Sequence, residues 1–131
     1  MPEKKTLKRA HQDEREGKAP STQAGEFVRE EMDHIREGKH GARSTKQAIA
    51  IGLSKARRAG VKLAAPKAGT TSEKTRTQAK RDSVKGASGG AKKTSAKRSA
   101  ASTRALKREG HAAASKEALS KQAKSAAAAR R

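Results

Sequence analysis

The chain has 131 residues, 33 of them Lys or Arg and 13 Asp or Glu, and a formal net charge of +20. It has no Cys, Trp or Tyr and one Phe, which excludes disulfides and thiolate metal sites and removes the aromatic side chains on which single-stranded nucleic acids stack. No apolar run is long enough for a membrane span or a signal-peptide core, so we expect a cytoplasmic protein.

Two helices are predicted in the first 37 residues, one over about residues 3–16 and one from Ser21 to Glu37. The second helix has an apolar face at helical spacing, formed by Ala24, Phe27, Val28, Met32 and Ile35. Its other face is acidic, and we expect it to be solvated or to pair with the basic third helix: Glu26, Glu30, Glu31, Asp33 and Glu37. Glycines predict the helix ends, at three Arg-Glu-Gly tripeptides (15–17, 36–38 and 108–110) and at Gly60.

A third helix is predicted to follow Ser44, with Gln47 completing a capping box, and to run to Ala59. The glycine-containing loop before it, residues 38–45, is favoured as a plain interhelical loop. A second interpretation is a backbone-phosphate clamp, because Lys39, His40 and Arg43 precede a helix N-terminus. A nucleotide-hydrolysing loop is disfavoured, since a helix and not a strand precedes it. Residues 21–60 also fit a helix-turn-helix, although the connection is longer than usual.

The predicted fold class is all-α, with a small two- to three-helix module at residues 1–65. Residues 66–98 are rich in Lys, Thr, Ser, Ala and Gly without periodicity, which predicts a disordered cationic linker. Residues 99–131 form a basic, Ala-rich tail, for which we expect two separate helices at about 99–109 and 115–130. Leu106 and Leu119 are the only large apolar residues of this tail.

The positive charge lies almost entirely after residue 37. Residues 1–37 contain 8 Lys/Arg and 9 Asp/Glu, whereas residues 38–131 contain 25 Lys/Arg and 4 Asp/Glu, a formal +21. Such a segment repels itself and favours a polyanionic partner. We therefore expect sequence-nonspecific binding of duplex DNA through phosphates. The candidate nucleic-acid-binding residues are Lys39, Arg43, Lys46, Lys55, Arg57, Arg58, Lys92, Lys93, Lys97, Arg98, Arg104, Lys107, Arg108, Lys121 and Lys124.

Other functions are expected to a lesser degree. RNA or ribosome binding is the alternative within the same class. From a different class, residues 20–60 could bind a protein partner through Phe27, Met32 and Ile35, with the tail localising the complex. No histidine has a second ligand at a spacing that defines a metal site, and no apolar pocket is predicted around the carboxylates near His34. We therefore expect no enzyme activity, no catalytic residue, no metal and no cofactor.

Two segments of the first half are similar to known sequences: GEFVREE at 25–31 and EGKHGARSTKQAIAIGLSKARRAG at 37–60. They resemble a family of short basic bacterial proteins of unassigned function, which tend to be described by prediction as DNA-binding or plasmid-stabilisation-like. The Lys/Ala-rich tail is similar in composition to linker-histone and bacterial histone-like tails. The resemblance implies a bacterial origin, and it brings no established mechanism or catalytic residues with it. The nucleoid-associated role that we expect comes from the basic segment and the scarcity of aromatic residues.

Overall fold

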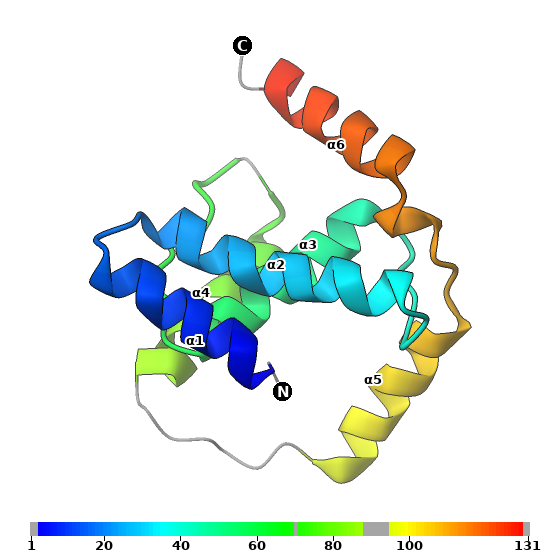
Figure 1. The fold of residues 1–131 in the computed structure, drawn as a ribbon, viewed down its shortest axis with the longest axis horizontal. Helices are drawn as coiled ribbons and strands as arrows, with labels where there is room; N and C mark the ends of the chain where they lie inside the picture. The colour runs from blue at the N-terminus through cyan, green and yellow to red at the C-terminus, as the bar shows by residue number, and fades with distance from the viewer. Residues whose placement is uncertain (1–2, 70, 88–94, 130–131) are drawn as a thin grey trace. The chain divides into compact units, whose positions relative to one another are not determined.

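The computed structural model describes residues 3–69, 71–87 and 95–129 (Figure 1). These residues form six α-helices and one short 3-10 helix: α1 (Lys4–Arg15), α2 (Pro20–Arg36), α3 (Thr45–Arg58), α4 (Glu73–Ala87), α5 (Ala96–Arg108), η1 (Ala112–Ala114) and α6 (Lys116–Ala129). The predicted all-α class is confirmed for the described residues. Within them, no helix combines the length and the apolar character that a membrane crossing requires.

The chain forms two compact units, each built from segments that are distant in the sequence. Unit 1 combines Met1–Glu30 with Ile51–Lys92, and unit 2 combines Glu31–Ala50 with Lys93–Arg131. Unit 1 therefore holds α1, the first part of α2, the last part of α3, and α4. Unit 2 holds the last turns of α2, the first turns of α3, and the helices of the tail.

Three helices end at the glycines that the sequence indicates. α1, α2 and α3 stop just before glycines with φ of +74°, +79° and +101°, namely Gly17, Gly38 and Gly60. At the end of α2, the Lys39 amide donates to the His34 carbonyl at 3.0 Å and the Gly38 amide donates to the Ile35 carbonyl at 3.1 Å. This is the Schellman arrangement, which reverses the chain and satisfies the last carbonyls of the helix.

The start of α3 also follows the sequence prediction. The Ser44 hydroxyl accepts a hydrogen bond from the Gln47 amide at 3.1 Å, and the Gln47 side-chain carbonyl accepts one from the Arg43 amide at 2.6 Å. The predicted capping box is therefore confirmed, with the reciprocal bond displaced by one residue to the position before the cap.

The core of unit 1 is small and lies between α1, α2 and α3. Its buried residues are Ala10, Ala24, Phe27, Ala56 and Val61, and the partly buried Leu7, Leu53 and Leu63 pack against them. α1 lies alongside α2 in this unit (Figure 1). The apolar face predicted for α2 is thus the face that it buries, with Phe27 fully enclosed.

Two acidic residues of α2 that we expected on a solvated face are buried. Glu31 is 0% exposed, and Glu30 is only 4% exposed. The Glu30 Oε1 atom accepts hydrogen bonds from the Glu3 backbone amide at 2.5 Å and from the Thr6 hydroxyl at 3.3 Å. The prediction is wrong for Glu30 because the N-terminal turn of α1, which has free amide hydrogens, covers this side of α2.

The prediction of a disordered linker over 66–98 is wrong for residues 73–87, which form α4. The buried face of α4 consists of Ala79 and Asp82, and Gly86 continues the same face one turn on. Asp82 accepts hydrogen bonds from three side chains: Ser54 at 2.8 Å, Arg58 at 2.9 Å and Gln78 at 3.0 Å. The buried positions of α4 repeat at helical spacing but hold small and polar residues. A search for apolar periodicity therefore does not find this helix. The predicted linker residues 88–94 lie outside the described residues.

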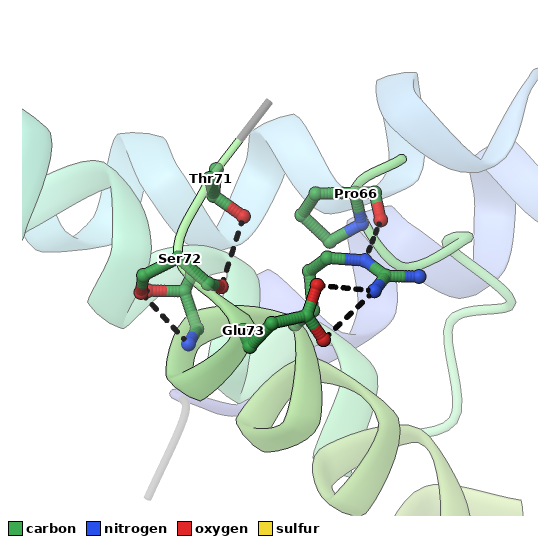
Figure 2. A network of polar contacts seen from close by, with 6 residues as sticks. Pro66, Thr71, Ser72 and Glu73 are labelled. Atoms are coloured by element: carbon green, nitrogen blue, oxygen red, sulfur yellow. Dashed lines mark hydrogen bonds and ion pairs between the residues drawn. The ribbon is translucent and has the colours of Figure 1, made fainter. Parts of the chain in front are cut away.

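Polar contacts fix the start of α4, as Figure 2 shows. The Ser72 hydroxyl accepts from the Thr75 amide at 3.2 Å and so caps the helix. One turn into the helix, Arg76 donates to both carboxylate oxygens of Glu73, at 2.8 and 3.0 Å, and to the Pro66 carbonyl at 3.0 Å. These bonds tie the first turn of α4 to the preceding loop.

Replacing Ser72 with alanine should lower the free energy of unfolding by about 1 kcal/mol, the usual cost of a lost N-cap. Urea denaturation followed by circular dichroism measures the change. Ser99→Ala is the matched control, because Ser99 lies exposed inside α5, where alanine is the better helix former. Equal effects of the two substitutions would argue against a capping role for Ser72.

Candidate functional site

Two of the predicted phosphate-binding residues, Arg57 and Arg58, are engaged inside unit 1. Arg57 is buried, and it donates to the Leu63 carbonyl at 3.3 Å and the Ala64 carbonyl at 2.9 Å. Arg58 pairs with the buried Asp82 carboxylate. Arg57 is thus enclosed by the fold, whereas the Arg58 side chain is 49% exposed and stays in the candidate interface.

The burial of the charged Arg57 side chain has to be compensated inside the fold. Burial lowers the pKa of Arg57, while the Asp82 carboxylate raises it. A guanidinium stays protonated in proteins, so Arg57 is a charge inside the fold that two backbone carbonyls and a nearby carboxylate compensate. Its positive charge contributes to the net charge without offering donors to an external phosphate.

The loop before α3 presents cations, but its helix N-terminus is occupied by its own cap. Arg43 and Lys46 are exposed, and Lys39 lies 3.3 Å from the Glu37 carboxylate. Ser44 takes up the Gln47 amide and Gln47 takes up the Arg43 amide, so the phosphate-clamp interpretation keeps fewer backbone donors. The charges of Arg43 and Lys46 remain available at this end of α3, and Lys55, farther along, is half-buried.

Within unit 2 this loop lies against the end of α5. The Gly41 amide donates to the Leu106 carbonyl at 2.8 Å, and the Ala42 amide donates to the Gly110 carbonyl at 3.0 Å. The Thr45 hydroxyl donates to a carbonyl of η1 at 2.6 Å. These bonds bring Arg43 into the same region of unit 2 as the last turn of α5.

α5 carries an exposed cationic stripe. Lys97, Arg104 and Arg108 are spaced by seven and four residues, which places them within roughly 40° of one another around a helix, and all three are exposed. Leu106, half-buried, is on the opposite side. α5 contains no buried residue, and the basic stripe extends over about 16 Å at about 1.5 Å per residue. Arg98 and Lys107 flank this stripe and are also exposed.

α4 carries a second stripe with the same spacing, which the sequence analysis missed. Lys74, Arg81 and Lys85 are exposed and lie on one face, about a quarter to a third of a turn from the buried Asp82 face. The signal that could have found them is the repeat of a basic residue at offsets of seven and eleven in both helices. The expectation of disorder over 66–98 removed any reason to look for it.

The remaining predicted residues are divided between α6 and the undescribed part. Lys121 and Lys124 are exposed on α6, whereas Lys92 and Lys93 lie outside the described residues. Of the fifteen predicted residues, the structure places Arg43 of the loop in the same region as Lys107 and Arg108 in the last turn of α5.

The apolar residues considered for a protein partner are not on the surface. Phe27 and Ile35 are 0% exposed and Met32 is 6% exposed. These side chains fill the interior of the units, so a partner cannot reach them without unfolding of α2.

The structure also brings together residues that no sequence spacing connects. Glu31 and His34 near the end of α2 approach His40 of the following loop, and their ligand atoms lie within 4.8 Å of one another. These three residues form the Glu31–His34–His40 cluster of unit 2. The chain positions of its members suggest no metal motif, but their side chains form a set that can hold a cation.

A comparison with known families finds one match. The profile of a family of unknown function, DUF6496, matches residues 4–67, which contain both segments that resemble a family of unassigned function. Its description includes no nucleic-acid-binding or histone-like role. The chain has no significant match among curated proteins or among solved structures.

Proposed function

We propose that this chain is a non-enzymatic nucleic-acid-binding protein that holds duplex DNA through its phosphates, with a nucleoid-associated role. The observation that carries the proposal is the cationic stripe of α5, whose free face presents Lys97, Arg104 and Arg108. DNA carries one phosphate charge per about 3.4 Å of axis on each strand. A stripe of about 16 Å is long enough to contact several phosphates, and small Ala and Ser residues between the cations let the helix approach closely.

The composition supports phosphate contacts over base reading. Bidentate recognition of adenine relies on Asn or Gln, and the chain has no Asn and five Gln. With six to ten phosphate contacts, the logarithm of the affinity should fall with the logarithm of salt concentration with a slope of roughly −5 to −9.

A charge-neutralising variant of the full chain tests the stripe. K97Q/R104Q/R108Q should make the salt slope shallower by about 2.7, the contribution of three phosphate contacts at about 0.9 each. Fluorescence anisotropy of a labelled duplex, measured over a range of salt concentrations, gives the slope. Unchanged circular dichroism would show that the variant is folded.

The matched control removes three positive charges from residues 1–37, where acidic and basic residues nearly balance. Lys4, Lys8 and Arg15 are exposed and share one face of α1, so K4Q/K8Q/R15Q lowers the net charge equally. It should change the slope by less than about 1, the contribution of a single contact. Equal effects of both triple variants would refute the assignment to α5, and salt-independent or absent binding by the wild type would refute the proposed function. If structured RNA displaces the duplex readily, RNA is the partner.

A further inference from the structure

We propose that the Glu31–His34–His40 cluster of unit 2 is a binding site for a Zn²⁺ ion. Glu31 and His34 lie three residues apart in α2, on one side of its last turns. His40 reaches them from the loop, because the turn at Gly38 reverses the chain directly after the helix. The proposal is independent of the nucleic-acid function above.

The donor set suits zinc. Imidazole nitrogens and carboxylate oxygens are ordinary zinc ligands, and two histidines with one glutamate form a known zinc ligand set. A tetrahedral ion with bonds of about 2.0–2.2 Å holds its ligand atoms roughly 3.3 Å apart. His40 Nε2 and Glu31 Oε2 are 3.2 Å apart. The third ligand atom, on His34, lies within 4.8 Å of both, so a side-chain rotation completes the set.

The hydrogen bonding of His40 supports a metal-ligand role. Its Nδ1 atom is 2.9 Å from the Gly41 carbonyl oxygen. A carbonyl can only accept, so Nδ1 carries the hydrogen, and Nε2 is the atom that faces Glu31. A histidine that donates one ring N–H to a backbone carbonyl and turns the other nitrogen to a cation is the usual arrangement at metal centres. A metal ion between Nε2 and the carboxylate would bind to both ligand atoms.

The cluster is enclosed and its loop is held in place. The side chains of Glu31 and His40 are 1% and 13% exposed, so the carboxylate has little water to stabilise its charge. Gly41, next to His40, has no room for a side chain because the Glu109 backbone lies against it, and its amide bonds to Leu106. A divalent ion would offset the buried charge and connect the end of α2 to the loop, with water in the fourth position.

Titration of the untagged full chain with ZnCl2 tests this site. By isothermal titration calorimetry the wild type should bind one Zn²⁺ per chain, and its thermal unfolding temperature should rise with zinc. H34Q and H40Q should each weaken binding by at least about 100-fold, because the loss of an outer-shell partner alone costs about 10–100-fold. In both variants the zinc-induced rise in unfolding temperature should disappear.

The control replaces the two histidines outside the cluster. His11 and His111 are exposed, and H11Q/H111Q should bind zinc as the wild type does. If this double variant loses as much affinity as H40Q, or if the wild type shows no saturable binding, the site is refuted. Should H34Q and H40Q fail to fold, X-ray absorption of the zinc-loaded wild type decides. Two imidazole ligands support the site, and fewer than two overturn it.

Discussion

Replacing Asp82 with alanine should lower the free energy of unfolding by about 3 kcal/mol. The Asp82 side chain is 2% exposed and accepts hydrogen bonds from Ser54, Arg58 and Gln78. A hydrogen bond to a charged group contributes about 1.5–3 kcal/mol, and the three donors share one carboxylate. Arg58 is half-exposed and regains water when its partner is removed, which limits the loss. Urea denaturation followed by circular dichroism measures the change.

Glu73→Ala is the matched control for Asp82→Ala. It removes a carboxylate from the same helix and also breaks an ion pair with an arginine, but the Glu73 side chain is 77% exposed. Exposed pairs contribute about 0–1 kcal/mol, so this variant should stay close to the wild type. If Asp82→Ala is as mild as Glu73→Ala, the Asp82 network does not hold α4 in unit 1. Amide exchange that becomes faster in α4 specifically would locate the effect.

Replacing Gly52 with alanine should destabilise the chain by about 1–2 kcal/mol, although alanine is the better helix former. A Cβ atom at Gly52 of α3 would lie 2.7 Å from Val28 Cα and 2.9 Å from Val28 Cγ2, on α2 in the same unit. The two helices therefore approach each other at backbone distance. Overpacking typically costs about 1–3 kcal/mol, and the gain in helix propensity of about 1 kcal/mol offsets part of that cost.

The substitution Gly25→Ala separates the effect of helix–helix packing from the effect of helix propensity. Gly25 also lies inside a helix, α2, but nothing is within 4 Å of a Cβ atom there. Alanine should stabilise this position by about 0.5–1 kcal/mol. The two substitutions, measured by urea denaturation, are thus expected to have opposite signs. A stabilising Gly52→Ala would show that α2 and α3 are not in close contact at Val28.

The net charge overstates the number of cations that can meet a phosphate. Arg57 contributes a charge to the basic segment, yet its side chain is buried and donates to the Leu63 and Ala64 carbonyls. Net charge governs long-range attraction, while the salt slope counts contacts. A measured slope is therefore the better test of the interface than affinity at one salt concentration.

The sequence by itself determined the first three helices and their ends. Glycine stops, the Ser44 cap and the spacing of apolar residues around Phe27 act within a few residues, so they can be read locally. The segregation of charge after residue 37 was also evident, and with it the class of partner that we propose. The division of the chain at residues 65 and 98 stays a prediction.

Only the tertiary structure decided the features that depend on contacts distant in the sequence. α4 is held by Asp82 against α3, 24 and 28 residues away, and Glu30 is buried because α1 covers it. The end of α5 is held in unit 2 by bonds from Gly41 and Ala42 of the loop before α3. The Glu31–His34–His40 cluster needs the chain reversal at Gly38. The roles of Asp82, Glu30 and the Glu31–His34–His40 cluster are set by what lies opposite these polar side chains and not by their own hydropathy.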